Sequence, residues 1–162
     1  MNFSLLMTPG HIGKLELKNR FIMAPMGHGF CDEDECYVND RLIEFFRQRA
    51  LGGYALIDVG AVQIDPLLNT NAGILKLYDD SYIPGMQRLT QAVHEAGGKI
   101  MAQLLHQGRY CSSREYGQPG VAPSAVYSRY TGETPREMTT DEVETMVGYY
   151  RSAAERVVKS GF

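Results

Sequence analysis

Short apolar runs of strand length alternate along this chain with longer segments in which apolar residues recur at helical spacing. The apolar runs cover residues 20–24, 54–62 and 99–105, and the helical segments cover residues 39–51, 80–96 and 139–160. Strands that alternate with helices form parallel sheets, because each helix carries the chain back to the edge where the next strand begins. The sequence therefore predicts an α/β fold.

Local signals support these boundaries. Asn39 is suited to cap the first helix, and the run from Thr139 to Glu142 has the pattern of a capping box. Residues 4–18 contain turn signals between short apolar stretches and predict a small hairpin or cap ahead of the first strand. Neither a GxGxxG motif nor a Walker A motif is present, so we expect a β/α barrel rather than a nucleotide-binding doubly wound sheet.

The run 99–105 contains one polar residue in its middle, Gln103. The rest of the run predicts a strand that is buried on both faces, where an amide costs free energy unless it is partnered. An amide offers donors and acceptors together, which suits the edge of a polar heterocycle. His106 and Arg109 follow at the C-terminal end of the strand, where parallel α/β folds bind ligands. A buried Gln satisfied by neighbouring backbone remains the alternative.

Two further features point to the same edge of the sheet. Gly60 lies near the C-terminal end of the run 54–62, where the missing side chain would let a flat ligand approach the backbone. A bulge or a packing glycine explains Gly60 equally well. Residues 107–138 are rich in Gly, Pro and Tyr and show no regular pattern, which is typical of a functional loop or lid.

Composition excludes several classes of protein. The chain has 162 residues and a formal net charge of -3, which gives no electrostatic case for binding nucleic acid or an anionic membrane. No apolar run is long enough to span a bilayer, and the N-terminus lacks signal-peptide features. The odd number of cysteines indicates a reducing, cytoplasmic location. Cys31, Cys36 and Cys111 could be metal ligands, but no second close-spaced pair accompanies them and we expect no metal site.

Several motifs resemble the old yellow enzyme family of FMN-dependent NAD(P)H oxidoreductases. They are Leu17-Lys18-Asn19-Arg20, Met23-Ala24-Pro25-Met26, Gln103-Leu104-Leu105-His106-Gln107-Gly108-Arg109, Ala122-Pro123-Ser124 and the helical segment 139–162. Within the family the chain is most similar to the branch of 2,4-dienoyl-CoA reductases, 2-enoate reductases and bile-acid-inducible oxidoreductases. The run 94–100 and Gly108-Arg109-Tyr110 carry that narrower resemblance.

The resemblance implies a TIM barrel with FMN at the C-terminal ends of the strands. Carried over by position, the cofactor-binding residues would be Ala24, Pro25, Met26 and Gly27 after the first strand, Gly60 at the flavin edge, and Gln103 at the pyrimidine side of the ring. His28, His106 and Arg109 are candidate contacts to the substrate or within the loops.

The resemblance also implies an activity, that of an ene-reductase. Hydride would pass from NADH or NADPH through FMN to an activated C=C bond in a ping-pong sequence, with a small enone, enoate or dienoyl-CoA as substrate. Two alternatives remain: a TIM-barrel lyase or isomerase without flavin, and a non-catalytic barrel fragment that serves as an assembly module.

A TIM barrel needs eight βα units and about 250 residues, whereas this chain holds about three units plus the hairpin. We therefore expect residues 1–162 to be the N-terminal portion of a flavin-binding domain and to be inactive alone, with the catalytic residues beyond Phe162. An iron–sulfur cluster and FAD would belong to domains absent from this chain. A homo-oligomer is expected for the full-length protein.

Overall fold

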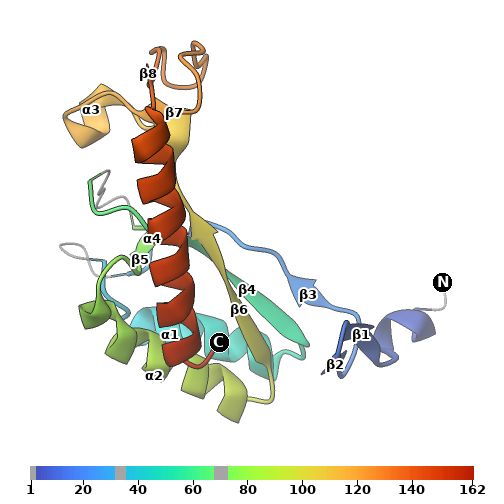
Figure 1. Cartoon of the computed structure of the whole chain (residues 1–162). Helices are drawn as coiled ribbons and strands as arrows, with labels where there is room; N and C mark the ends of the chain where they lie inside the picture. Colours follow the sequence, from blue (N-terminus) through green and yellow to red (C-terminus); the bar gives the residue numbers. More distant parts are fainter. Residues whose placement is uncertain (1–2, 32–35, 68–72) are drawn as a thin grey trace.

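The computed structural model describes residues 3–31, 36–67 and 73–162, and its centre is a parallel sheet (Figure 1). β4 (Leu56–Gln63) lies between β3 (Ile22–Met23) and β6 (Lys99–Leu105), and β5 (Leu75–Lys76) pairs with the end of β4. All these pairings are parallel. The predicted α/β class and the parallel sheet are therefore confirmed.

Helices cover one face of this sheet. They are α1 (Asp40–Leu51), α2 (Ile83–Glu95), which follows the short η2 (Asp80–Tyr82), and α4 (Thr140–Lys159), which runs beside β6 in Figure 1. The core between the layers includes Leu42, Phe46, Met86, Leu89 and Val93 from the helices and Ile57, Val59 and Ile100 from the strands. Burial of this apolar area is the main force that holds the layers together.

The predicted helix starts are confirmed by their caps. The Asn39 side chain accepts a hydrogen bond from the Leu42 N–H at 2.9 Å. At the start of α4, the Thr139 hydroxyl accepts from the Glu142 N–H, and the Glu142 carboxylate accepts from the Thr139 N–H. These bonds satisfy N–H groups that have no partner within the helix.

The predicted N-terminal hairpin is also present. It consists of η1 (Ser4–Met7) followed by the antiparallel pair β1 (Gly10–Ile12) and β2 (Leu15–Leu17). Leu17 is buried with residues 55–56 at the N-terminal end of β4. Asn19 donates to the Gly53 carbonyl at 2.8 Å, which fixes the hairpin to the turn after α1.

The long segment 107–138 is more regular than its sequence indicates, and the prediction of an irregular loop was wrong. It contains η3 (Gly108–Tyr110), α3 (Ser113–Tyr116) and the parallel pair β7 (Val121–Ala122) and β8 (Arg136–Glu137). Both Ser113 donors, its N–H and its hydroxyl, reach the Glu133 carboxylate at 2.9 and 2.7 Å. Elements this short give no periodic signal, so long-range hydrogen bonds decide the structure here.

We call the second face of the sheet the concave face, because it would line the inside of the expected barrel. It carries no covering layer within the described chain. Ile22 is 43% exposed and Met101 is 40% exposed, whereas Ile100 beside it is buried against the helices. The prediction that the run 99–105 is buried on both faces was therefore wrong for this chain. The alternation of a strand sends Ile100 to the helices and Met101 and Gln103 to the open face.

Candidate functional site

Three of the predicted site residues meet where β3, β4 and β6 end. A Cβ placed on Gly60 would lie 2.5 Å from the Pro25 Cβ and 2.8 Å from the Gln103 Oε1. No side chain fits in that space, so glycine is required for Pro25 and Gln103 to approach β4. The register between β4 and β6 also shifts between Val59 and Val62. Gly60 thus has the bulge and packing role that the sequence left open, at the edge where a ligand was predicted.

The Gln103 amide is exposed on the concave face. It makes no hydrogen bond to any residue that the structure describes, so a buried Gln satisfied by backbone is not what the structure shows. Its donors and acceptors are free for a ligand at this position. The amide is thus suited to hydrogen-bond the polar edge of a flat ring.

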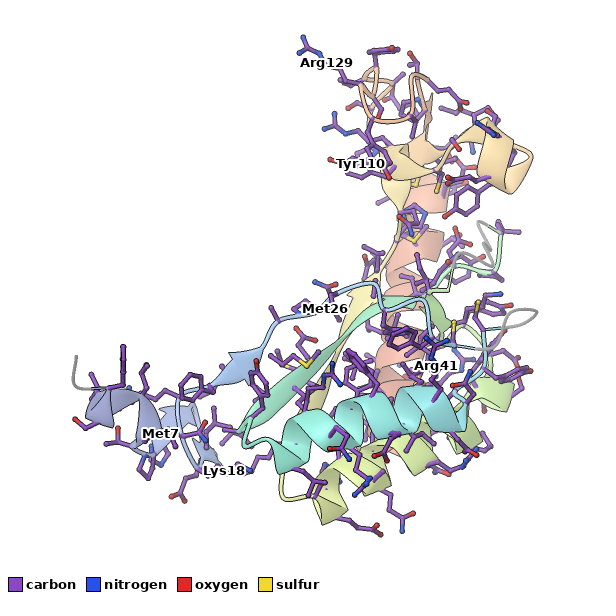
Figure 2. The ribbon with its side chains drawn as sticks, turned by 180° about the vertical axis from the view of Figure 1, so that it is seen from behind. Met7, Lys18, Met26, Arg41, Tyr110 and Arg129 are labelled. Carbon is purple, nitrogen blue, oxygen red and sulfur yellow. The ribbon has the colours of Figure 1, made fainter. Side chains whose placement is uncertain are left out.

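We call the place where Pro25, Gly60 and Gln103 meet the cradle. The segment after β3 lies beside it. Ala24, Met26 and Gly27 are exposed, and Met26 projects into the open space beside the sheet in Figure 2. Gly27 has no atom within 4 Å of the position of a Cβ, and its φ is not in the positive range. Gly27 therefore does not serve a turn that needs positive φ. The backbone of this segment is open to a ligand.

Asp58 is a residue of the concave face to which the sequence analysis gave no role. It pairs in register with Met101, two residues before Gly60. Its Oδ1 is buried and has no hydrogen-bond partner, and burial raises the pKa of the carboxyl. Such burial disfavours the charged form of a carboxyl group. Its signal in the sequence is a single acidic residue within an apolar strand.

His106 faces Asp65 at the same edge of the sheet. The His106 Nε2 lies 3.3 Å from the Asp65 Oδ2, and the two side chains are 9% and 3% exposed. The His106 Nε2 makes no hydrogen bond at this contact. Asp65 itself accepts a hydrogen bond from the Leu67 N–H at 2.7 Å. Asp65 follows β4 by two residues and His106 directly follows β6. The position of Asp65 just past the end of β4 was the signal in the sequence that could have identified this residue.

His28 does not lie with the other predicted residues. Its ring packs edge-on against Phe46 of α1, with the centroids 5.8 Å apart. Its Nδ1 accepts from the Phe30 N–H at 3.2 Å, and burial lowers the pKa of the imidazole. These contacts place His28 toward the helix layer, whereas the cradle lies on the other face of the sheet. His28 thus makes a contact within the loop, and its role toward the substrate stays a prediction.

Arg109 lies on the rim beyond β6. It is exposed, its guanidinium is 5.5 Å from the centre of the Tyr110 ring, and within the described chain it makes no ion pair. It lines a recess together with His106, Pro123 and Ser124. Arg109 is thus available to a ligand rather than engaged in holding the loop.

The structure brings no metal site together among the residues it describes. Cys31 and Cys36 are hydrogen-bonded to each other, and burial raises the pKa of Cys31 to about 12, as it does for Cys111. Such thiols are neutral at physiological pH, whereas a metal takes the thiolate. The acidic residues 32–35 lie outside the described residues. No described helix is long and apolar enough to cross a membrane.

Comparison with known proteins places this arrangement in a family. The model of the "NADH:flavin oxidoreductase / NADH oxidase family" matches residues 5–162. A metal reductase from Desulforamulus reducens is 47% identical over 98% of the chain, which spans 23% of that protein. A cinnamate reductase from Clostridium sporogenes is 36% identical over 99% of the chain, which spans 25% of that protein.

Solved structures agree with the sequence matches. The complex of 2-naphthoyl-CoA reductase with 2-naphthoyl-CoA superimposes with a TM-score of 0.91 at 29% identity, over 99% of this chain and 26% of that one. An old yellow enzyme homologue from Zymomonas mobilis gives 0.86 at 31% identity, over 97% and 46%. The predicted resemblance and the assignment to part of a TIM barrel are confirmed. The chain spans less than half the length of these relatives.

Proposed function

Since the chain belongs to the NADH:flavin oxidoreductase / NADH oxidase family, we propose that residues 1–162 form the N-terminal portion of a flavin-binding TIM-barrel domain. The complete protein would be an FMN-dependent NAD(P)H oxidoreductase that reduces an activated C=C bond. One observation carries this proposal: Pro25, Gly60 and Gln103 converge at the C-terminal ends of neighbouring strands.

The residues present fit FMN. Gly60 lets Pro25 and Gln103 pack closely over β4, and the unpaired Gln103 amide can hydrogen-bond the polar edge of a flat ring. Met26 and Gly27 offer exposed backbone from the next strand along the sheet. Bound here, FMN would accept hydride from NAD(P)H and donate it to the substrate. The chain's own part is to orient the ring and to hold it against the strand ends.

We infer the substrate class from the names of two relatives. One is a cinnamate reductase and the other was solved with 2-naphthoyl-CoA, and both names describe an unsaturated system conjugated with a carbonyl group. Such conjugation makes the β-carbon electrophilic, so a hydride acceptor of this kind suits a flavin enzyme. We propose that the donors that stabilise the developing enolate lie outside residues 1–162, as does the proton donor.

The sizes of the relatives suggest further domains. The metal reductase and the cinnamate reductase are about four times as long as the stretch they share with this chain, because that stretch makes up 23% and 25% of them. An NADPH dehydrogenase from Bacillus subtilis is 33% identical, and the chain spans 46% of it. We propose the larger type for this protein, with any iron–sulfur cluster and FAD bound outside residues 1–162, and a homo-oligomer as the working form.

The test is to purify the complete protein that contains this chain and to identify its flavin. We expect bound FMN that NADH or NADPH bleaches without oxygen and that cinnamate or its CoA thioester reoxidises. A colourless protein with lyase or isomerase activity would overturn the proposal. Flavin that binds but is never reduced by NADH or NADPH would instead favour a non-catalytic assembly module.

A further inference from the structure

Two recesses adjoin at the top of the molecule, outside the cradle. One is lined by Leu105 to Tyr110 together with Ala122, Pro123, Ser124 and Val126. The other is lined by Arg109, Tyr110 and the run 127–130. Arg109 and Tyr110 line both recesses, so the two lie next to each other and are treated as one surface. We name it the Arg–Tyr groove and define it by Arg109, Tyr110, Tyr127, Arg129 and Tyr130.

The Arg–Tyr groove is positive in a chain whose net charge is -3. Arg109 and Arg129 are both exposed, and neither forms an ion pair within the described chain. No carboxylate is among the described residues that line the two recesses. The carboxylate of Glu133, the acidic residue next along the chain, is bound to Ser113. Two guanidinium groups are therefore available to an anion.

The Arg–Tyr groove also presents aromatic faces. Tyr110, Tyr127 and Tyr130 are 50%, 56% and 80% exposed. The rings of Tyr110 and Tyr130 meet edge to face, with their centroids 5.5 Å apart. In Figure 2 the labelled Tyr110 and Arg129 project to the same side of the molecule as Met26, which lies beside the cradle. Exposed rings beside unpaired guanidinium groups favour a ligand that is flat, aromatic and anionic.

The position of the groove connects it to the cradle. Its first lining residue, Leu105, ends β6, and Gln103 lies two residues before it on the same strand. A ligand with its reactive end at Gln103 that extended beyond the end of β6 would pass His106 and Arg109. Its distal part would then lie near Arg129 and Tyr130.

We propose that the Arg–Tyr groove binds the phosphate-and-adenine arm of a nucleotide whose reactive end lies at the cradle. The arginines would hold the phosphates, and the tyrosines would stack on the adenine. This proposal rests on the proposed function. Two molecules of the proposed reaction carry such an arm: a CoA thioester substrate and the nicotinamide dinucleotide. A nucleic acid fits less well, because binding it needs contacts from more than two cationic side chains. The net charge of -3 would also repel its phosphates.

The first test is direct binding, with coenzyme A and NADH as separate calorimetric probes of the complete protein. We expect Arg129→Ala to raise the Kd of one probe about tenfold, as loss of one charge-assisted hydrogen bond does. The effect should shrink as NaCl screens the charges. Arg129→Lys should restore part of the affinity. Arg129 suits this test because backbone bonds around Ser128 hold its turn.

The matched control is Arg114→Ala, which removes the same charge from the same segment but outside both recesses. Its Kd values should stay at those of the wild type. Tyr130→Ala should weaken the same probe as Arg129→Ala and do so at any salt concentration, because stacking is not a charge effect. Unchanged Kd values in both groove variants would overturn the proposal. Equal losses in the Arg114 control would overturn it too, because they would indicate a diffuse charge effect.

The half-reactions identify the source of the arm. A loss confined to flavin reoxidation by a CoA thioester, with the free acid unaffected, assigns the groove to the substrate. A loss confined to flavin reduction by NADH or NADPH assigns it to the dinucleotide. Binding of an oligonucleotide in preference to both probes would overturn the proposal. Because the calorimetry needs no bound flavin, a protein without FMN would refute the proposed function while still testing the groove.

Discussion

Replacement of Gln103 by Leu tests the predicted contact with the flavin. Leu has nearly the volume of Gln but no donor or acceptor, so the packing against Gly60 is kept while the ligand's polar edge loses its partner. A ring atom left unpaired in a dry site costs about 1–3 kcal/mol, which raises the Kd for FMN by about 5-fold to 150-fold. The assay is titration of FMN into the flavin-free complete protein, followed by flavin fluorescence.

The structure also predicts what Gln103→Leu leaves unchanged. Because the amide has no hydrogen-bond partner within the described chain, the free energy of unfolding without flavin should change by less than about 0.5 kcal/mol. Gln91→Leu is the matched control, since this exposed residue of α2 bonds Glu95 on the outer surface and no other residue of the described chain, and it should bind FMN as the wild type does. An unchanged Kd in Gln103→Leu would refute the assignment of Gln103 to the ring.

Three more predictions follow from packing and charge. Gly60→Ala should destabilise the complete protein by about 1–3 kcal/mol in urea unfolding, since the new methyl would overlap Pro25, whereas Gly148→Ala on open helix surface should be neutral or slightly stabilising. Burial lowers the pKa of His28, so stability should fall as the pH drops below the unfolded value of about 6.5, and His28→Gln should flatten that dependence. Residues 1–162 alone should bind FMN weakly and self-associate through Ile22 and Met101, so a monomeric yellow protein in ultracentrifugation would contradict this expectation.

Local signals predicted the features that are themselves local. The caps at Asn39 and Thr139 depend on residues within one turn of helix, and both are present. The pairing of Asp65 with His106 depends instead on the register of two strands that are far apart in sequence. Nothing in either segment alone indicates that register. The β7–β8 pair was missed for a different reason, because two-residue strands leave no periodic pattern in the sequence.

The site residues could be placed from the sequence only as far as strand ends could be located. Gly60 and Gln103 were assigned to the ends of neighbouring parallel strands, and they do meet there. His28 was a candidate contact to the substrate or within the loops, and its ring packs against Phe46. The direction of a side chain in a loop depends on what the loop packs against, which the sequence of the loop does not contain.

The outer surface of α4 supports the proposed domain. One side of this helix packs on α2, and Arg156 pairs with Asp80 of the preceding η2 at 2.7 Å. Its other side carries Val143, Val147, Tyr150 and Val158, which are 41%, 65%, 40% and 76% exposed. These residues recur at helical spacing, as on a helix face that packs against a neighbour. In a TIM barrel the helices form a closed ring. A following helix of the proposed barrel would therefore cover this stripe, just as following strands would cover Ile22 and Met101 on the concave face.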